Sequence, residues 1–477
     1  MTPLWTAIDL AEATGGTVSR PFNATGVSID TRTLVPGDLF VALVGEGRDG
    51  HDFVLDAMAK GAAGALVHRP VSGADRTLLV DDTLAALARM GGFARSRFEG
   101  EVIAITGSVG KTTTKEMVRT ILSAFGPTHA AVASYNNHWG LPLTLARTPL
   151  DARFCVVEIG MNHPGEIAPL ARLARPHVAV ITTIEKAHIG HMGSIEAIAD
   201  EKAAILTGLE PEGVAILPID NALYPRLRVA AGAHRVVTFG AAPGTAQEAA
   251  QGADIRLTGL EQDADGSLIE AEIAGRPIRF RLNAPGRHMA MNALAALAAT
   301  STVLAGADRA AIAEQAAAAL EAFAPLSGRG ARRRIDLPAG TALLLDESYN
   351  GNAASMRAAL EVLRLQPATR RIAVLGDMRE LGDEGPAEHA GLAPDVIRSA
   401  DLVFTCGPLM RGLHDAIPAD LRAAHAEVST DLAAMVASTL APGEAILVKG
   451  SLGTRMKPIV DAIDALTTPP SPTTGAA

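Results

Sequence analysis

A glycine-rich turn followed by a lysine and three threonines, between positions 102 and 116, is the segment of this chain best suited to chemistry. The apolar run at 102–105 predicts a strand, and apolar residues at helical spacing after Lys111 predict a helix. A strand, a glycine turn and a helix N-terminus together bind phosphate, because free backbone N–H groups and the helix dipole favour an anion. We therefore expect a nucleoside triphosphate here, with the hydroxyl of Thr112 on Mg²⁺.

The turn follows the short pattern Thr-Gly-x-x-Gly-Lys-Thr, since Ile105 occupies the position at which the full eight-residue phosphate loop has glycine. An ordinary turn of this composition is the alternative. The residues predicted to surround the phosphates are Thr106, Gly107, Ser108, Val109, Gly110, Lys111, Thr112 and Thr113.

Two more side chains suited to a divalent metal follow predicted strands. Glu158 lies near the end of one apolar run, and His188 follows the next one after a short loop. Ligands of parallel α/β sheets gather at the carboxyl ends of strands, so both are candidate metal ligands beside Thr112. The spacing of His188 and His191 also suggests a zinc site as an alternative. The lack of neighbouring cysteines and the glycine between the two histidines disfavour zinc.

Lys202 stands in the apolar stripe of a helix predicted to begin after Ser194. A lysine in such a position can extend its ammonium group to the surface along its apolar stem. The second interpretation is a partly buried amine with a lowered pKa, whose neutral form can react. A carbamate formed with CO₂ would turn this cation into an anion able to face Mg²⁺.

Other polar loops are candidates for binding. The first hundred residues carry charged side chains around glycine turns, for which a solvated loop and a small polar ligand are both open interpretations. Asn136 and Asn137 lie in a polar loop after the phosphate-binding helix, and Asn292 opens an alanine-rich helix where it could hydrogen-bond a base. Glycine-containing polar clusters also follow three predicted strands, at 346–352, 376–382 and 449–451. We expect a second set of ligand contacts at those strand ends.

The elements that must position these side chains follow an α/β pattern, in which short β-branched runs alternate with helix-like segments from residue 100 onward. The predicted strands are 102–105, 155–159, 178–184 and 214–217, and in a second set 342–345, 372–375, 402–405 and 445–448. The first hundred residues are enough for a separate small domain. The weakly patterned 240–277 predicts an irregular antiparallel appendage, 325–330 a hinge, and the Thr/Pro/Gly-rich tail disorder.

Composition narrows the class of protein. A length of 477 residues predicts about three domains, and the net charge of −10 disfavours a nucleic-acid-binding protein, which would show a basic face. Cys155 and Cys406 stand far apart in apolar runs and are expected to be buried, reduced thiols. We see no signal peptide and no apolar run of membrane-spanning length, so we expect a cytoplasmic protein without membrane insertion.

Taken together and in order, these segments resemble the Mur ligases, the ATP-dependent amide-forming enzymes of peptidoglycan precursor synthesis. The resemblance covers nearly the whole chain, and its specificity comes from the ordered set of motifs. The matching motifs are Asp30-Thr-Arg, Pro36-Gly-Asp-Leu-Phe, Thr106-Gly-Ser-Val-Gly-Lys-Thr, Asn136-Asn-His-Trp-Gly-Leu-Pro-Leu, Glu158-Ile-Gly-Met, His188, Lys202, Asn292, Arg329, Glu347-Ser-Tyr-Asn-Gly-Asn, Gly376-Asp-Met and Val448-Lys-Gly-Ser.

The resemblance implies an α/β fold of three domains, and it assigns roles position by position. The implied domains are 1–98 for a UDP-sugar, 99–326 for ATP and a Rossmann-like 327–466 for the incoming amine, followed by a disordered tail at 467–477. Catalytic roles are implied for Lys111, Lys202 (as a carbamate), His188 and Glu158, metal binding for Thr112, Glu158 and His188, and nucleotide contacts for Asn292, Arg329 and Glu347. Substrate contacts are expected from Ser28, Asp30, Thr31, Arg32, Arg48, Asn136, Asn137, Tyr349, Asn350, Asn352, Lys449 and Ser451.

The resemblance is strongest to the family members that add D-alanyl-D-alanine to UDP-N-acetylmuramoyl-tripeptide. It implies that ATP converts a carboxylate to an acyl phosphate, which the amine of the dipeptide attacks to give the UDP-MurNAc-pentapeptide, ADP and phosphate. The expected cofactors are ATP and Mg²⁺, and the expected partners are the two substrates. We expect a monomer that binds no nucleic acid.

One position departs from the family pattern, because Asp346 and Glu347 stand where the family often has two aspartates. Three alternatives remain open. Folylpolyglutamate synthetase has its phosphate loop near the chain start, and the diaminopimelate- or lysine-adding Mur ligases carry an Asp-Asn-Pro-Arg motif that is absent here. A non-catalytic nucleotide-binding switch would need neither an acceptor domain nor Lys202 on an apolar helix face.

Overall fold

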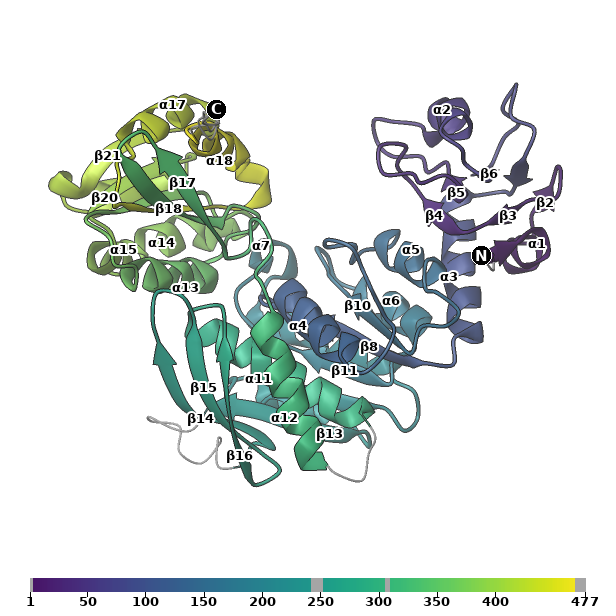
Figure 1. Cartoon of the computed structure of the whole chain (residues 1–477), viewed down its shortest axis with the longest axis horizontal. Helices are drawn as coiled ribbons and strands as arrows, with labels where there is room; N and C mark the ends of the chain where they lie inside the picture. Colours follow the sequence, from purple (N-terminus) through teal and green to yellow (C-terminus); the bar gives the residue numbers. More distant parts are fainter. Residues whose placement is uncertain (1–2, 242–251, 305–308, 468–477) are drawn as a thin grey trace, which may run out of the picture.

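The computed structural model describes residues 3–241, 252–304 and 309–467. This part of the chain is an α/β protein of three lobes, each built around one large sheet (Figure 1). The N-terminal lobe (purple) and the C-terminal lobe (green to yellow) stand on the same side of the central lobe (blue to teal). The predicted fold class is confirmed, whereas the predicted disordered tail lies outside the described residues apart from Thr467. No helix in the described ranges is long and apolar enough to cross a membrane.

The N-terminal lobe contains a five-stranded sheet of order β2-β7-β6-β5-β4, parallel from β4 to β7 and antiparallel between β7 and β2. Its strands are β2 (Thr17–Val18), β4 (Gly26–Ser28), β5 (Asp38–Val41), β6 (Gly64–Val67) and β7 (Thr77–Leu79), beside a pair formed by β1 (Trp5–Thr6) and β3 (Asn23–Ala24). Its helices are α1 (Ala7–Thr14), η1 (Gly50–Phe53), α2 (Val54–Ala59) and α3 (Thr83–Arg97). Consecutive residues such as Leu39 and Phe40 are both buried, because helices cover both faces of the sheet.

The N-terminal hydrophobic core continues into the central lobe through α5 (Gly140–Ala146), whose Leu143 belongs to that core. Trp5 donates from Nε1 to the carbonyl oxygen of Ala146 at 2.8 Å. Arg147 donates from Nε to the carbonyl oxygen of Val27 at 2.5 Å. Helix α5 therefore joins the two lobes directly after the polar loop that carries the predicted asparagines.

The central lobe holds a nine-stranded sheet of order β16-β15-β14-β13-β12-β11-β8-β10-β9, parallel from β9 to β14 and antiparallel from β14 to β16. Its strands are β8 (Glu101–Thr106), β9 (Thr128–Ala130), β10 (Phe154–Glu158), β11 (Val178–Ile181), β12 (Val214–Pro218), β13 (Arg235–Ala241), β14 (Ile255–Gln262), β15 (Ser267–Ile273) and β16 (Arg276–Leu282). Besides α5, its helices are α4 (Lys111–Ser123), α6 (Ile167–Ala174), α7 (Ile189–Met192), α8 (Ile195–Ala203), η2 (Ala204–Gly208), α9 (Tyr224–Ala230), α11 (Arg287–Val303), α12 (Arg309–Ala319) and η3 (Leu320–Ala322).

The predicted antiparallel arrangement at 240–277 is confirmed for its described part, and its irregularity is limited to one register shift between Leu257 and Gly259. Apart from that shift, strands β14 to β16 pair in regular antiparallel register and extend the parallel sheet. Alternate residues such as Ile269 and Ala271 are buried in one cluster with the alanines of α11. Glu270 and Glu272 fill the positions between them, which gives the period-two alternation of a strand with one face toward solvent.

The C-terminal lobe holds a six-stranded sheet of order β17-β18-β22-β19-β20-β21, in which only the pairing of β17 with β18 is antiparallel among the described strands. Its strands are β17 (Ala331–Leu337), β18 (Gly340–Glu347), β19 (Arg371–Gly376), β20 (Leu402–Cys406), β21 (Arg422–Ala426) and β22 (Ala445–Lys449). Its helices are α13 (Ala353–Arg364), η4 (Gly382–Glu384), α14 (Gly385–Ala390), α15 (Ala393–Ser399), α16 (Met410–Ala416), η5 (Ala419–Leu421), α17 (Ser429–Thr439), η6 (Leu452–Thr454) and α18 (Lys457–Asp464). The chain returns from β21 to insert β22 beside β18, which pairs Glu347 with Lys449. Cys155 and Cys406 are free and buried, as predicted.

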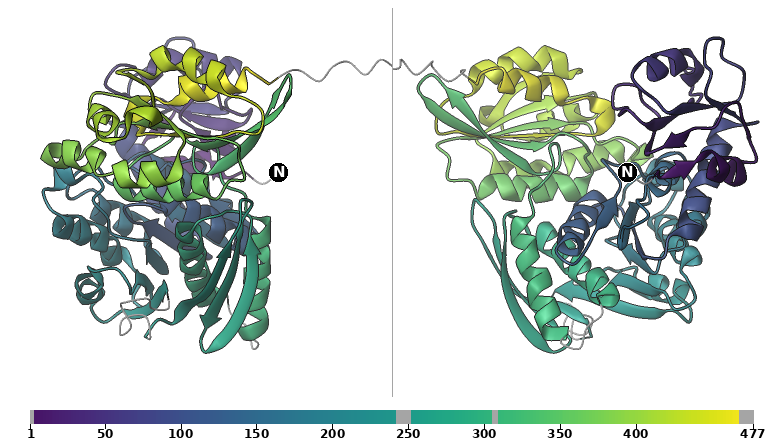
Figure 2. Two further views of the ribbon diagram at one scale, coloured as in Figure 1. Left: turned by 90° about the vertical axis from the view of Figure 1, so that its left-hand side faces the viewer. Right: turned by 45° about the vertical axis from the view of Figure 1, so that its right-hand side comes forward.

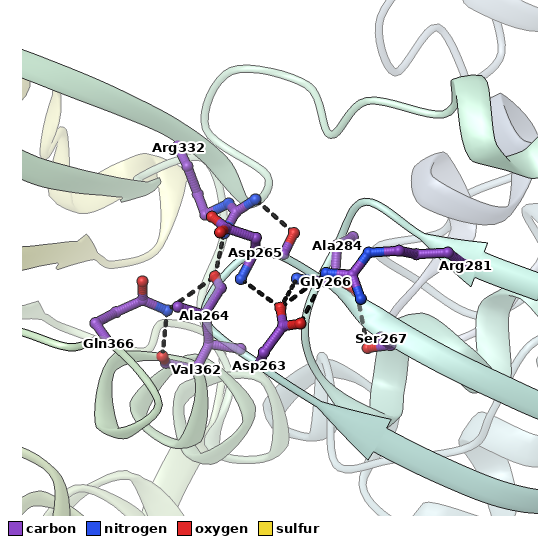
Figure 3. A network of polar contacts seen from close by, with 10 residues as sticks. All are labelled: Asp263, Ala264, Asp265, Gly266, Ser267, Arg281, Ala284, Arg332, Val362 and Gln366. Carbon is purple, nitrogen blue, oxygen red and sulfur yellow. Dashed lines mark hydrogen bonds and ion pairs between the residues drawn. The ribbon is translucent and has the colours of Figure 1, made fainter.

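The tip of the hairpin between β14 and β15 reaches the C-terminal lobe (Figures 2 and 3). Asp263 closes the tip by accepting hydrogen bonds on Oδ1 from the backbone N–H groups of Asp265 and Gly266, both at 2.8 Å. Arg332 of β17 donates to the carbonyl oxygens of Ala264 and Asp265. It also forms an ion pair with the Asp265 carboxylate at 3.3 Å. The hairpin tip is thus a polar junction between the two lobes.

We expect Arg332→Met to loosen this junction, because methionine keeps an apolar stem and loses the donors to two carbonyl oxygens. Each net hydrogen bond contributes about 1 kcal/mol, so the loss of both should make amide hydrogen exchange at Asp265 and Gly266 up to about thirtyfold faster. Arg279→Met is the matched control, since Arg279 on the adjacent strand β16 pairs with Glu270 of β15 at 3.5 Å, away from the tip. Equal exchange at the tip in the two variants would contradict the junction.

Candidate active site

The phosphate loop joins the end of β8 to the start of α4. Gly110 has φ +84°, and a Cβ added there would lie 2.4 Å from Oδ1 of Asn292. Gly107 has φ +144°, and a Cβ there would lie 1.9 Å from Oγ1 of Thr182. Both positions therefore require glycine, and the backbone can approach a ligand closely. Lys111 folds back over the turn, and its Nζ donates to the carbonyl oxygen of Gly107 at 2.8 Å.

The charge of Lys111 is coupled to its surroundings. Burial lowers the pKa of its ammonium group, the carboxylate of Glu158 raises it, and the guanidinium of Arg329 lowers it. An anion bound at the loop would favour the protonated form and so oppose the effect of burial. The loop therefore fits a phosphate group both in shape and in charge.

Thr112 and Glu158 meet because β10 pairs with β8 in a register that sets Glu158 opposite Ile105. Oγ1 of Thr112 donates to Oε2 of Glu158 at 2.7 Å. Nδ2 of Asn136 donates to Oε1 of the same carboxylate, also at 2.7 Å, and Oγ of Ser134 lies 3.3 Å from Oγ1 of Thr112. Hydroxyl and carboxylate oxygens are the hard ligands that Mg²⁺ prefers, so this pair fits the predicted metal.

His188 lines a cavity between the central and C-terminal lobes, to which Glu158 also contributes. Its ring is paired with a residue of the C-terminal lobe. Its Nδ1 hydrogen-bonds to the carboxylate of Glu380. This hydrogen bond holds the pKa of Glu380 below its usual value. A second ion pair between the lobes joins Lys186 to Glu384 at 2.7 Å. Within the described ranges no group of three or more His, Cys, Asp or Glu side chains could hold a metal, so the zinc site raised by His191 does not form there.

We expect Glu380→Gln to favour separation of the central and C-terminal lobes, because it keeps the side-chain shape and removes the charge that faces His188. An exposed ion pair contributes about 0.2–1 kcal/mol, so the ratio of joined to separated lobes should change up to about fivefold. The radius of gyration in solution scattering should rise accordingly. Asp383→Asn, a neighbouring acidic position, is the control, and an equal radius in both variants would contradict the contact.

The pH dependence of this contact follows from the lowered pKa of Glu380. A carboxylate with a depressed pKa contributes stability that is fully present above its unfolded value, about 4.3 for Glu. That contribution is lost as the pH falls through the lowered pKa. Scattering at successively lower pH should therefore show the lobes separating only in the acid range.

Lys202, on α8, is 1 % exposed. Burial holds the pKa of its amine well below the ordinary value, and the positive charge of Lys111 lowers it further, while Glu201 and Glu158 oppose the shift. The side chain does not reach the surface, so of the two interpretations the buried amine agrees with the structure. A lowered pKa makes the neutral, reactive form available.

Arg329 lies in the segment 325–330, directly before β17, and extends back to the phosphate site. Its Nη2 donates to Oγ of Ser134 at 2.8 Å, and its guanidinium carbon lies 4.1 Å from the ring centroid of Tyr349. Stacking on an aromatic ring fixes the plane of a guanidinium group and suits it to an anion. Arg329 therefore brings a positive charge from the C-terminal side to the hydroxyls around Thr112.

Glu347 and Lys449 form the C-terminal wall of the site as neighbours on β18 and β22. Nζ of Lys449 lies 3.4 Å from Oε2 of Glu347 and donates to the carbonyl oxygen of Asn350 at 3.0 Å. Asn352 accepts on Oδ1 from the backbone N–H of Ser355 at 2.9 Å and so caps α13. The polar cluster 346–352 thus combines cavity-facing charges with the start of a helix.

Asp346, which was not among the predicted site residues, anchors the segment 325–330 that was predicted to be a hinge. It is 2 % exposed, and its Oδ2 accepts from Oγ of Ser327 at 3.1 Å and from the backbone N–H of Gly328 at 3.0 Å. Its Oδ1 accepts from the hydroxyl of Ser348 at 2.6 Å. Successive strand residues point to opposite faces, so Asp346 holds this segment while Glu347 faces the cavity. Strand alternation was the signal that could have separated their roles.

A cavity of about 650 Å³ lies between the central and C-terminal lobes, a size that suits a small-molecule ligand. The predicted residues that line it are Ser108, Val109, Gly110, Lys111, Thr113, Asn136, Asn137, Glu158, His188, Asn292, Arg329, Glu347, Tyr349, Asn350, Asn352 and Lys449. The predicted residues outside its lining are Thr106, Gly107, Thr112, Lys202, Ser451, Ser28, Asp30, Thr31, Arg32 and Arg48. Lining residues that sequence reasoning missed include Ser134, Asn221, Phe239 and His288. Of these, Ser134 stood next to a predicted polar loop, which is the signal that could have found it.

The structure does not bring the N-terminal candidates into this cavity, because they lie in the N-terminal lobe at and beyond the end of β4. Ser28 is buried and donates from Oγ to the carbonyl oxygen of Asp30 at 3.1 Å. Arg32 pairs with Asp30 at 2.6 Å, and this hydrogen bond lowers the pKa of Asp30 to about 2. Thr31 is half-buried, and Arg48 is exposed. These side chains form a separate polar surface at the end of a parallel strand.

Two predicted hydroxyls are directed into the protein. Oγ of Ser451 donates to the carbonyl oxygen of Gly351 at 3.2 Å and accepts from the backbone N–H of Arg379 at 2.9 Å. Thr106 is fully buried, and its Oγ1 has no hydrogen-bond partner among the described residues. Ser451 therefore holds two strand-end clusters together, and Thr106 packs under the phosphate loop.

Three models of one family match this chain in succession. The model described as "Mur ligase family, catalytic domain" matches residues 23–89. The "Mur ligase middle domain" matches 105–300, and the "Mur ligase, glutamate ligase domain" matches 333–452. The matches follow the order of the three lobes.

The chain is also similar over its length to individual proteins. The UDP-N-acetylmuramoyl-tripeptide–D-alanyl-D-alanine ligase of Synechocystis sp. is 36% identical over 441 residues, which are 91% of this chain and 90% of that protein. The enzyme of the same name from Escherichia coli is 35% identical over 92% of this chain and 93% of its own. The crystal structure of MurF from Acinetobacter baumannii superimposes with a TM-score of 0.82 at 30% identity, covering 97% of this chain and 99% of that chain. This chain belongs to the Mur ligase family.

Proposed function

We propose that this chain is the ATP-dependent ligase that joins D-alanyl-D-alanine to UDP-N-acetylmuramoyl-tripeptide, giving the UDP-MurNAc-pentapeptide precursor of peptidoglycan. The observation that carries the proposal is the composition of one cavity. Lys111 and Glu158 line it from the central lobe, and Arg329, Glu347 and Lys449 line it from the C-terminal side. Relatives with this name cover nine-tenths of the chain and are similarly covered by it.

The chemistry follows from what an amide bond needs. A carboxylate is a poor electrophile, so one of its oxygens first attacks the γ-phosphorus of ATP, and the bond from that phosphorus to the leaving ADP breaks. The amine nitrogen of the dipeptide then attacks the carbonyl carbon of the acyl phosphate and loses a proton. Phosphate leaves with the electrons of the C–O bond. The positive charges of Lys111 and Arg329, both half-buried, stabilise the negative charge on the transferred group.

Thr112 and Glu158 would hold Mg²⁺, which supplies further positive charge at the phosphates. Asn292 faces the phosphate loop across Gly110 and is placed to contact the nucleotide. The buried amine of Lys202 is suited to carbamylation, because CO₂ adds to a neutral amine. The resulting carbamate would bring a negative charge into the neighbourhood of Lys111.

Each lobe has a proposed substrate. Residues 1–98 bind the UDP-sugar through Ser28 and the loop with Asp30 and Arg32, residues 99–326 bind ATP, and residues 327–466 bind the incoming amine. Because the site is divided between lobes, their closure completes it and excludes the water that would hydrolyse the acyl phosphate. The enzyme acts in the cytoplasm as a monomer.

The experiment is ATP-dependent phosphate release with Mg²⁺ and UDP-MurNAc-tripeptides that carry either diaminopimelate or lysine, with and without D-Ala-D-Ala. Release that needs both substrates, with a product mass increased by the dipeptide, is the expected result. Release with a free amino acid instead of the dipeptide would assign another Mur ligase reaction. Tight ATP binding without release for any acceptor would support a nucleotide-binding switch.

A further inference from the structure

Lys115, four residues after Lys111 on α4, is completely buried. Its Nζ donates to the carbonyl oxygen of Ala131 at 2.6 Å and to that of Ala133 at 2.8 Å. It also lies 2.9 Å from Oε1 of Glu116. An ammonium group has three N–H donors, so all of them are engaged by protein atoms. Lys115 therefore has no donor left for a ligand, and its role must lie in the segment that it holds.

The segment held by Lys115 is strained and leads to the active site. Ala133 has φ +54°, a left-handed conformation that costs a residue other than glycine about 1–2 kcal/mol. The next residue, Ser134, accepts on Oγ from Nη2 of Arg329 at 2.8 Å, and this oxygen lies 3.3 Å from Oγ1 of Thr112. One hydrogen bond from Lys115 ends on the carbonyl oxygen of the strained Ala133 itself and the other on that of Ala131, so both favour the conformation that presents the Ser134 hydroxyl.

We propose that Lys115 is a positioning residue, which holds Ala131 and Ala133 so that the hydroxyl of Ser134 joins Arg329 to Thr112. One hydroxyl then couples the position of the arginine from the C-terminal side to the phosphate and metal site of the central lobe. Asn136, which contacts Glu158 at 2.7 Å, follows in the same loop and depends on the same anchor. The catalytic consequence rests on the proposed ligase function, whereas the placement of the loop does not.

The first test is Lys115→Met, which keeps the apolar stem and removes all three donors. Displacing catalytic groups by about 1 Å can cost about 10²-fold in rate, so we expect kcat to fall between about tenfold and a hundredfold. The Kd for ATP without acceptor should change less than about threefold, because Lys111, Gly110 and Asn292 are untouched. Lys457→Met, on the exposed face of α18, is the matched control.

A rescue variant separates positioning from simple loss of stability. Glycine adopts the left-handed conformation without strain, so Ala133→Gly added to Lys115→Met should recover about fivefold in kcat, the equivalent of about 1 kcal/mol. If Lys115→Met fails to fold, Ser134→Ala tests the same link between Arg329 and Thr112. We expect it to lower kcat about tenfold, the effect of one hydrogen bond to a charged group, with no further loss when combined with Lys115→Met.

Hydrogen exchange provides a readout that does not need ligase activity. The amides of 131–137 should exchange faster in Lys115→Met than in the Lys457→Met control. Adding Ala133→Gly to Lys115→Met should slow their exchange relative to Lys115→Met alone. Unchanged exchange, or an unchanged kcat in Ser134→Ala, would overturn the proposal. If the parent chain shows no ligase activity while the exchange results hold, the proposed function fails and the positioning role stands.

Discussion

Replacing Lys111 by methionine is expected to lower kcat for phosphate release at least about 10³-fold, while the protein remains folded. The lysine is the cation of the phosphate loop, and removing a group that stabilises transition-state charge in a water-excluded site costs about 10²–10³-fold even for a neutral donor. Because burial lowers the pKa of this ammonium, the folded state disfavours its charge, and the neutral methionine should not lower the melting temperature.

The Lys111 experiment needs kcat, ATP affinity and thermal unfolding on the same preparations. Lys60→Met is a matched control, since Lys60 is an exposed lysine of the N-terminal lobe that pairs with Asp56 at 2.9 Å. A kcat within about tenfold of the parent value would be smaller than the loss of one preorganised donor. Such a result would exclude Lys111 from the transferred phosphoryl group.

Replacing Lys202 by alanine is expected to lower kcat at least about 10²-fold while ATP still binds, because the change removes the buried group proposed to carry a carbamate. Formate or acetate should restore part of the rate, since a small carboxylate can enter the space left by the side chain and supply the negative charge. Rates with and without added formate, and ATP affinity by calorimetry, measure both effects.

The parent enzyme should show a matching dependence on CO₂ and pH. The pKa of Lys202 is lowered by burial, so more of the neutral amine that reacts with CO₂ is present at neutral pH than in an exposed lysine. As the pH falls through that lowered pKa, the amine becomes protonated, and removal of dissolved CO₂ should then inactivate more strongly. Full activity of Lys202→Ala without any added carboxylate would exclude a carbamate on Lys202 from the reaction.

Most strands that place the site could be predicted from local sequence. The runs at 102–105 and 214–217 lie within β8 and β12, because buried parallel strands read as continuous β-branched segments. Strand β15 was not predicted as a regular strand, although its buried Ile269, Ala271 and Ile273 alternate with Glu270 and Glu272. Its alternating run is short, so it is a weaker local signal than the continuous apolar runs of the fully buried strands.

Some contacts of the candidate site could also be predicted from local sequence, and others could not. Thr112 and Glu158 were predicted together because both stand at strand or loop ends in a parallel pattern, and the structure places them 2.7 Å apart. Ser134 and Lys115 were not predicted, because a serine in a loop and a lysine on a helix have no distinctive local pattern. His188 was predicted as a metal ligand, and its contact with Glu380 could not have been foreseen from either segment.

The sequence by itself determined the phosphate loop and the parallel α/β pattern, because these depend on residues close together in the chain, and it indicated the family through the order of several short motifs. Backbone conformation at a glycine or the start of a helix is a local property. The tertiary structure decided which distant side chains meet. Arg329 and Ser134 are 195 residues apart in the chain, and His188 and Glu380 are 192 residues apart. Both pairs are nevertheless in contact. Such meetings depend on strand order and lobe packing, which no short segment specifies.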